Sequence, residues 1–195
     1  MKVAILKYNA GNTQSVIYAL KRIGIEPLLT NTPEEIRSAD KVIFPGVGEA
    51  STTMEHLRET GLDKIIPTLK QPVIGICLGL QLMCRHSEEN DTAGLGIFDV
   101  EVRKFQLEEG FKIPHMGWNT LQVTDNPLLK GLPADPHAYF VHSYYAEISP
   151  FTIGESHYIN RFSAALHRDN FYAVQFHPEK SAETGATILK NFIEL

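Results

Sequence analysis

The sequence contains little cysteine, no block of like charges and no long apolar run, and each absence excludes a class of protein. Two cysteines, Cys77 and Cys84, lie in one apolar segment of a 195-residue chain, so we expect no disulfide framework. No segment approaches the roughly 20 apolar residues that cross a bilayer, and the apolar start of the chain is too short for a signal peptide. We therefore expect a cytoplasmic protein with reduced thiols and no membrane contact.

Charge and histidine spacing exclude two further classes. The chain carries 18 Lys and Arg against 23 Asp and Glu, and like charges adjoin only in pairs, so we expect no binding of nucleic acid. The eight histidines show neither His-x-His nor His-Glu-x-x-His spacing, so we expect no metal site. We also expect no cofactor.

The N-terminal half alternates apolar runs with amphipathic segments. Four apolar runs bounded by turn residues are predicted to be strands: residues 2–8, 25–29, 41–44 and 72–76. Asn12 can cap a helix over residues 16–23 after a turn at residues 9–11, and residues 33–36 predict a brief second helix. Apolar strands that alternate with helices are typical of a parallel sheet covered on both faces.

After about Gly94 the pattern changes. Five short strand-like runs follow, separated by turn residues: 100–105, 120–123, 139–141, 163–166 and 171–176. Apolar residues at helical spacing in 182–195 predict a closing amphipathic helix. We expect one α/β domain over residues 1–195, with a mostly parallel central sheet, helices on both faces and a more antiparallel, β-rich C-terminal half.

The segment 75–79 (GICLG) places Cys77 at the end of a buried strand and the start of a helix. Glycines two residues before and two after the cysteine match a nucleophile elbow, in which a tight turn exposes the side chain and small neighbours avoid clashes. The helix N-terminus favours a thiolate there. The sequence therefore predicts that Cys77 is a nucleophile, the alternative being a buried cysteine at a glycine-rich strand end.

A nucleophilic thiol needs a base, and the segment 175–179 (QFHPE) follows the last predicted strand. We expect His177 to take the proton from Cys77, and Glu179 to orient the imidazole and stabilise its cation. Both segments lie at the carboxyl ends of predicted strands, where open α/β sheets place their sites. The alternative is a loop histidine beside a surface glutamate.

A third glycine-rich segment, 44–48 (FPGVG), also ends a predicted strand. Two glycines around one residue allow backbone angles that aim an N–H group at a developing oxyanion. An ordinary tight turn is the alternative.

These motifs resemble the class I, or triad, glutamine amidotransferases, whose fold is flavodoxin-like, and the resemblance spans essentially the whole chain. The elbow at 75–81 (GICLGLQ) and the His-Pro-Glu string that begins at His177 carry it. Three further strings resemble one branch of that superfamily, the glutaminase subunits of imidazole glycerol phosphate synthases from histidine biosynthesis: residues 45–48 (PGVG), 114–119 (PHMGWN) and 139–144 (YFVHSY).

The resemblance implies that Cys77 attacks the side-chain amide of glutamine, that His177 protonates the leaving ammonia and that water then hydrolyses a thioester. It assigns the oxyanion donors to the backbone N–H groups of Val47 and Leu78. Val47 is expected to be a switch, whose N–H turns toward the site when the partner carries its substrate. The resemblance also assigns glutamine binding to a group of nearby positions: Gly46, Gly48, Gln81, Ser143 and Tyr144.

The resemblance further implies a partner, a cyclase subunit built as a (β/α)8 barrel of about 250 residues. Because the chain has 195 residues and ends after its last predicted helix, we expect the barrel to be a separate polypeptide that receives the ammonia. Five residues are expected to face it: Met116, Trp118, Asn119, Tyr139 and Lys180. Trp and Tyr are enriched at interface hot spots, whereas the alternative for Trp118 is a place in the core.

Three rival interpretations stay open on the sequence alone. A glutaminase of the same superfamily could feed another synthase, such as one that makes pyridoxal phosphate or anthranilate, but the strings around His115 and His142 match the histidine branch. A catalytically silent regulatory subunit is disfavoured by the intact triad. An unrelated cysteine hydrolase of flavodoxin-like fold is disfavoured, because the sequence shows no second matched substrate pocket. The spacing of His115 and His142 assigns them no chemical role, and Cys84 is expected on an apolar helix as a small core residue.

Overall fold

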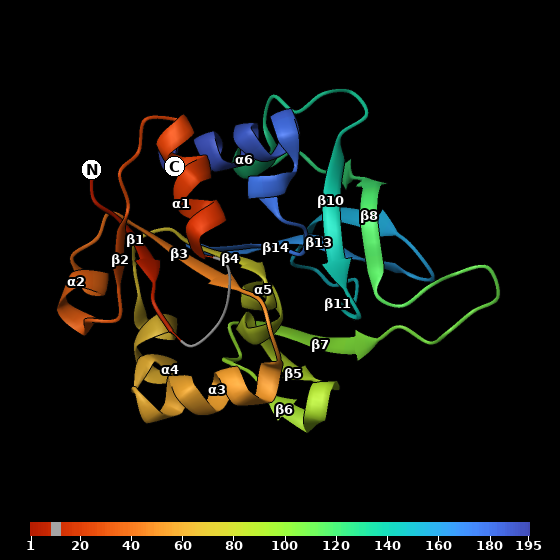
Figure 1. Cartoon of the computed structure of the whole chain (residues 1–195), viewed down its shortest axis with the longest axis horizontal. Coiled ribbons are helices and arrows are strands. Elements are labelled where there is room, and N and C mark those ends of the chain that lie inside the picture. The colour runs from red at the N-terminus through yellow and green to blue at the C-terminus, as the bar shows by residue number, and fades with distance from the viewer. Residues whose placement is uncertain (9–12) are drawn as a thin grey trace.

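The computed structural model describes residues 1–8 and 13–195, and their central feature is an eight-stranded sheet (Figure 1). Its strands run in the order β2-β1-β3-β4-β14-β13-β12-β9. Their bounds are Val3–Leu6 (β1), Leu28–Thr30 (β2), Lys41–Gly46 (β3), Val73–Cys77 (β4), Gln122–Val123 (β9), Thr152–His157 (β12), Arg161–Arg168 (β13) and Phe171–Val174 (β14). The predicted cap at Asn12 and the turn at residues 9–11 lie outside the described residues.

The strands from β2 to β14 in this order pair in parallel, and those from β14 to β9 pair antiparallel. The helices are Thr13–Arg22 (α1), Pro33–Arg37 (α2), Ala50–Glu59 (α3), Leu62–Ile65 (α4), Leu78–Met83 (α5) and Ala182–Glu194 (α6). In Figure 1, α1 and α6 lie above the sheet and α3 and α4 lie below it. The predicted arrangement, a mostly parallel sheet between helices with a more antiparallel second half, is confirmed. No helix in the described part of the chain is long and apolar enough to cross a membrane.

Side chains alternate between the two faces along each buried strand, so the sheet has a separate hydrophobic core on each face. In β1, Val3 and Ile5 pack on the side of α1 and α6, whereas Ala4 and Leu6 pack on the side of α3 and α4. Successive side chains of a strand point to opposite faces, so a strand that is apolar at every position must be covered on both faces. The continuous apolar runs in the sequence reflect this double burial.

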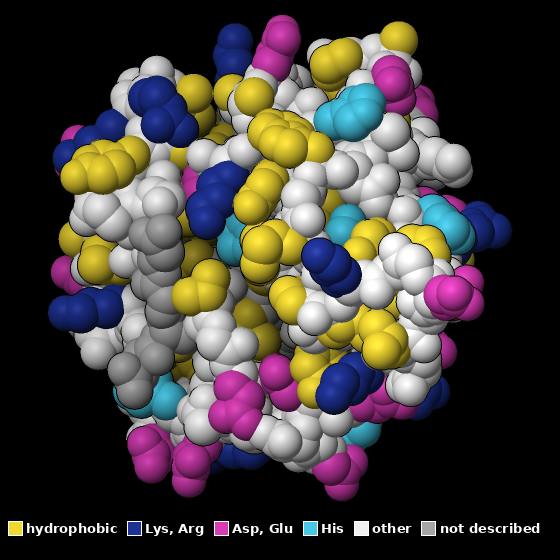
Figure 2. All heavy atoms as spheres, turned by 45° about the vertical axis from the view of Figure 1, so that its right-hand side comes forward, with side chains coloured by type: hydrophobic (Ala, Val, Ile, Leu, Met, Phe, Trp, Pro, Cys, Tyr) yellow, Lys and Arg dark blue, Asp and Glu magenta, His cyan; other side chains and the backbone are white. Residues whose placement is uncertain are grey.

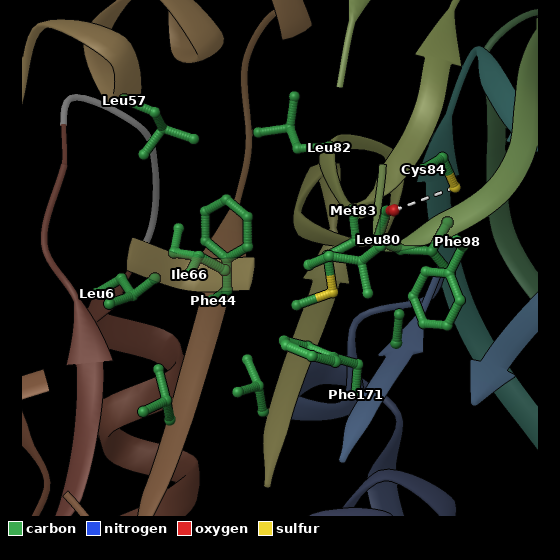
Figure 3. Packing of buried hydrophobic residues seen from close by; sticks show 14 of the residues in the cluster. Leu6, Phe44, Leu57, Ile66, Leu80, Leu82, Met83, Cys84, Phe98 and Phe171 are labelled. Carbon is green, nitrogen blue, oxygen red and sulfur yellow. Dashed lines mark hydrogen bonds between the residues drawn. The ribbon is translucent and has the colours of Figure 1, made fainter. Parts of the chain in front are cut away.

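The expected helical position of Cys84 is wrong, because α5 ends at Met83 and Cys84 begins a strand, Cys84–Ser87 (β5). Its thiol is buried and donates a hydrogen bond to the carbonyl oxygen of Leu80 at 3.4 Å (Figure 3). In Figure 3 the residue lies near Phe98, at one end of the core that lies under the sheet. Cys84 is therefore a small core residue, as predicted.

Two smaller sheets lie beside the C-terminal half of the central sheet. One has four strands in the order β11-β7-β5-β6, and the other is the antiparallel pair β10-β8, seen at the right of Figure 1. Their further bounds are Thr92–Ala93 (β6), Phe98–Lys104 (β7), His115–Thr120 (β8), His137–His142 (β10) and Tyr144–Ala146 (β11). The sequence did not indicate β5, β6, β8, β11 or β12. The turn between β10 and β11 carries Ser143 toward the ends of the parallel strands.

Candidate active site

Cys77 is the last residue of β4 and adopts φ 54° and ψ −107°, a left-handed backbone that is unfavourable for a residue with a side chain. A strained turn of this kind is the mark of a nucleophile elbow, because it lifts the side chain clear of the strand. Close packing of α5 against β3 and β4 requires the flanking glycines. A Cβ on Gly79 would lie 2.1 Å from the Phe44 carbonyl oxygen, and one on Gly75 would lie 2.9 Å from the backbone of Gly79.

His177 lies directly beyond β14, which pairs in parallel with β4, so sheet register brings it to Cys77. Its Nδ1 lies 2.8 Å from Oε1 of Glu179, and the two side chains are only 6% and 4% exposed. Because Nδ1 faces the carboxylate, Nε2 is left for the hydrogen bond to Cys77. Burial lowers the pKa of His177, but the hydrogen bonds to Cys77 and Glu179 outweigh it and raise the pKa to about 10.

The carboxylate of Glu179 balances the positive charge of the His177 imidazolium, and only one of its two oxygens has a hydrogen-bond partner among the described residues. Its second oxygen, Oε2, is buried and has no hydrogen-bond partner among the described residues. A carboxylate removed from water in this way interacts strongly with a neighbouring cation, because a low local dielectric screens the charges weakly. The three side chains therefore have the geometry of a nucleophile, its base and the group that orients the base.

The predicted oxyanion segment lies beside the nucleophile, with Gly46 of β3 paired to Cys77 of β4. A Cβ on Gly46 would meet Cβ of Leu78 at 2.8 Å, so glycine is needed here for close packing. Gly48 has φ 117°, a conformation that glycine adopts readily. The hydroxyl of Tyr8, two residues after the end of β1, donates a hydrogen bond to the carbonyl oxygen of Pro45 and so anchors the peptide before Gly46.

A cavity of about 370 Å³ opens at Cys77 and brings together most of the predicted site. Its lining includes predicted residues from four segments of the chain: Val47, Gly48, Cys77, Leu78, Gln81, Ser143, Tyr144 and His177. Gly46 is not among the described residues of this lining; it is buried, and its backbone packs closely against Leu78. Lys180, predicted to face the partner, also lines the cavity.

Two residues at this site were not singled out from the sequence. Glu89 lines the cavity, and its carboxylate accepts the backbone N–H of Ala50 at 2.7 Å. Burial raises the pKa of Glu89, although that hydrogen bond opposes the shift. Gln175 is fully buried, and its Nε2 lies 3.8 Å from Sγ of Cys77. The string QFHPE could have drawn attention to Gln175, whereas nothing local distinguishes Glu89 from the acidic residue before it.

Four of the five predicted partner-facing residues form a cluster beside the cavity. Met116 is 62% exposed and Trp118 is 54% exposed, so the alternative that Trp118 fills the core is wrong. Trp118 pairs with Tyr139 across β8 and β10, with ring centroids 5.9 Å apart, and Lys180 Nζ lies 6.0 Å from the Tyr139 ring. Figure 2 shows hydrophobic side chains gathered on the face that carries these strands. We call Met116, Trp118, Tyr139 and Lys180 the rim cluster.

Asn119 does not belong to the rim cluster. It follows Trp118 in β8, and successive side chains of a strand point to opposite sides. Its Nδ2 donates to the carbonyl oxygen of His157 at 2.7 Å, so its hydrogen bonds lie within the chain. Asn119 thus lies on the other side of β8 from Met116 and Trp118, and its expected contact with the partner stays a prediction.

A cysteine, a histidine and a glutamate that meet at the ends of two neighbouring parallel strands, beside a cavity, define an enzyme with a thiol nucleophile. The chain belongs to the class-I glutamine amidotransferase family, whose model matches residues 4–195. It is similar to "Imidazole glycerol phosphate synthase subunit HisH" of Bacteroides fragilis, at 60% identity, and of Bacteroides thetaiotaomicron, at 59% identity; each match covers 100% of both chains. The motif-based resemblance is thus confirmed, and the chain is a glutamine amidotransferase.

The fold has solved counterparts among more distant proteins. The chain is similar to a putative GMP synthase component from Thermoplasma acidophilum, with a TM-score of 0.75 and 21% identity, over 100% of this chain and 93% of that one. At this identity the likeness concerns the fold alone.

Proposed function

We propose that this chain is the glutaminase subunit of an imidazole glycerol phosphate synthase. It hydrolyses glutamine through a thioester on Cys77 and supplies ammonia to a separate cyclase subunit in histidine biosynthesis. The observation that carries the proposal is the Cys77–His177–Glu179 arrangement at the cavity. The names of relatives at 59–60% identity support the pathway and the partner. They also argue against a glutaminase for pyridoxal phosphate or anthranilate, and the complete triad argues against a silent regulatory subunit.

The proposed chemistry has two halves. In the first, the thiolate of Cys77 attacks the amide carbon of glutamine, and N–H groups of Val47 and Leu78 stabilise the negative oxygen. His177 then gives its proton to the leaving nitrogen, which departs as ammonia and leaves a thioester. In the second half, His177 takes a proton from water, the resulting hydroxide attacks the thioester, and glutamate leaves with Cys77 restored.

Partner dependence tests this proposal directly. Glutamate release is measured for the chain alone, with a purified barrel cyclase, and with cyclase and its ribonucleotide ligand. We expect slow turnover alone and the fastest turnover with cyclase and ligand, because the Val47 N–H is proposed to align only in the loaded complex. Full turnover without a partner would refute the switch at Val47. Stimulation by a pyridoxal phosphate synthase but not by the cyclase would refute the pathway.

Glu89 is proposed to bind the α-ammonium group of glutamine. It is the one carboxylate among the described residues that line the cavity. Both Nε2 hydrogens of Gln81 are already donated, to Tyr144 O at 3.0 Å and Gln175 Oε1 at 3.1 Å. The Gln81 amide oxygen is proposed to accept a hydrogen bond from the substrate.

Replacing Glu89 by glutamine is expected to raise KM for glutamine about 10- to 100-fold, since a hydrogen bond between charged groups is lost. The new side chain would keep an amide oxygen for the Ala50 N–H, so α3 stays anchored. Initial rates of glutamate release in the complex measure the effect. Glu88→Gln is the matched control, because Glu88 accepts from the Lys104 N–H and is not among the described cavity residues. An equal KM increase in both variants would contradict the assignment.

The rim cluster is proposed to contact the cyclase around the mouth of the cavity, so that ammonia passes between subunits without reaching solvent. Trp118→Ala is expected to weaken binding of the cyclase about 30-fold or more, the size of an interface hot spot of about 2 kcal/mol. Isothermal titration calorimetry measures the change in Kd. Val123→Ala is the control, because Val123 is an exposed apolar residue on the edge strand β9. Unchanged affinity in Trp118→Ala would remove this surface from the interface.

We also propose that the chain is a single cytoplasmic domain. Strands from both halves of the sequence join one central sheet, which supports a single unit. Cys77 and Cys84 are both free thiols, as a reducing compartment requires.

A further inference from the structure

Two buried histidines, His115 on β8 and His142 at the end of β10, lie in contact and take no part in the chemistry proposed above. They are only 3% and 5% exposed. Nδ1 of His115 lies 3.1 Å from Nε2 of His142, and the rings meet at a steep angle. His142 lines the cavity, whereas His115 is not among the described residues of its lining. The pair therefore reaches the cavity through one member only.

The atoms at each end of the pair determine which nitrogens carry the protons. Nδ1 of His142 lies 2.7 Å from the carbonyl oxygen of Tyr144, which only accepts, so this Nδ1 is protonated. Nε2 of His115 lies 3.4 Å from Nδ2 of Asn119, which only donates, so this Nε2 carries no proton. His115 must then be protonated on Nδ1, and it donates to the bare Nε2 of His142.

The orientation of the Asn119 amide is fixed independently. Its Oδ1 accepts the backbone N–H of Thr120 at 2.8 Å, and its Nδ2 donates to the His157 carbonyl at 2.7 Å. An amide turned by 180° would lose both hydrogen bonds. The direction of donation is therefore the same at every step, from Asn119 through His115 and His142 to Tyr144.

This direction requires both rings to be neutral. Burial lowers the pKa of His142 to about 3, a shift opposed by the hydrogen bond to Tyr144 and aided by His115 and His177. Burial also lowers the pKa of His115 to about 4. A second proton on His142 would point at the N–H of His115 and add a positive charge near the imidazolium of His177.

The chain of donors ends on a carbonyl of the cavity wall. Tyr144 O accepts from His142 Nδ1 and from Gln81 Nε2, so both of its lone pairs are used. It is therefore an anchor and not a group that substrate can bind. Because Ser143 and Tyr144 both line the cavity, fixing this carbonyl fixes the backbone against which a ligand lies.

We propose that His115 and His142 are positioning residues for the substrate glutamine: the one-way hydrogen-bond chain through both neutral imidazoles holds the Ser143–Tyr144 wall of the cavity in its binding conformation. Hydrogen bonds aligned in one direction polarise one another, which stiffens such a chain. The inference rests on the proposed glutaminase function.

The first test is independent of activity. Long-range nitrogen–proton NMR spectra of the histidine-labelled chain report the tautomer of each ring, with assignments from single-histidine variants. We expect neutral Nδ1–H forms for His115 and His142. His167 supplies an internal contrast, because Asn126 Nδ2 faces its Nδ1 at 3.0 Å and Asp169 O faces its Nε2 at 2.9 Å, which requires the Nε2–H form. An Nε2–H or charged form of either His115 or His142 at neutral pH overturns the proposal.

The second test measures glutamine kinetics in the complex with the cyclase. His115→Phe keeps the stacking on Tyr158 but removes the donor to His142, and we expect KM for glutamine to rise about tenfold with ammonium-supported cyclisation unchanged. His115→Asn, whose amide N–H replaces Nδ1–H, should stay within about twofold of the parent chain. His167→Phe, which keeps its stacking on Tyr172, is the control and should change neither rate.

An unchanged KM in His115→Phe, or an equal loss of both activities, overturns the proposal. If His115→Phe does not assemble with the cyclase, the NMR measurement of the tautomers in the parent chain alone decides the proposal. Absence of glutaminase activity in the parent complex would instead defeat the proposed function, with the NMR result still standing.

Discussion

Cys77→Ala is expected to abolish glutamine-supported cyclisation by the complex while cyclisation with added ammonium salt continues at the parent rate. The thiol is the only proposed nucleophile, and loss of a nucleophile costs about 10⁴-fold or more in a triad enzyme. The proposed cyclase should not need this thiol, because dissolved ammonia can reach its site from solution. Formation of imidazole glycerol phosphate from each nitrogen source, measured at equal cyclase concentration, separates the two activities.

The matched control for this experiment is the second thiol of the chain. Cys84→Ala removes a buried thiol whose pKa is raised by burial and by the charge of Glu101; the thiol packs in the core and donates to the Leu80 carbonyl. We expect it to keep both activities and to lose some stability from the small cavity it leaves. Loss of both activities in Cys77→Ala would mean that the residue supports the complex and not the chemistry.

The parallel half of the sheet could be predicted from the sequence because its strands are buried on both faces. Residues 41–44 and 72–76 are apolar almost throughout, and β3 and β4 occupy Lys41–Gly46 and Val73–Cys77. The predicted strand at residues 25–29 lies too early, since β2 spans Leu28–Thr30. The ends of the short strand β2 are set by its pairing with β1, and the residues of β2 alone do not reveal this pairing.

Among the elements that the sequence did not indicate, α3 and β8 show why a weak local pattern hides an element. α3 buries Ala50, Met54 and Leu57 at helical spacing, but threonines lie between them and the first residue follows a glycine-rich turn. β8 carries Met116 and Trp118 on its exposed side, so its apolar residues do not mark a core face. A strand of this kind can be recognised only once its partner β10 and the exposed surface are known.

The site shows the same division between local and tertiary information. Cys77 and His177 lie in short strings whose spacing predicts their chemistry, and strand register brings them together. Glu89 reaches the cavity from the turn after β5, and the contact between His115 and His142 depends on the pairing of β8 with β10. The sequence alone, without these tertiary contacts, gives the three residues no role.

Glu179→Gln is expected to lower kcat for glutamine about 10²- to 10⁴-fold while the structure is retained, the range seen when a group that supports acid–base catalysis is impaired. Glutamine can still accept the Nδ1–H of His177, so the ring stays oriented. What is lost is the negative charge that stabilises the imidazolium, the form that protonates the leaving ammonia. Ammonium-supported cyclisation should be unaffected, as in Cys77→Ala.

The pH profile distinguishes this electrostatic role from simple misplacement of the ring. The pKa of His177 is raised to about 10, so its protonated form persists up to that pH in the parent enzyme. Without the carboxylate the pKa falls toward the ordinary value, and the alkaline limb of kcat/KM should move to lower pH. Glu183→Gln, at an exposed position in the first turn of α6, should leave the limb in place. A lower kcat with an unmoved alkaline limb would mean that Glu179 acts by geometry alone, because loss of its charge should lower the pKa of His177 even though the contact with Cys77 remains.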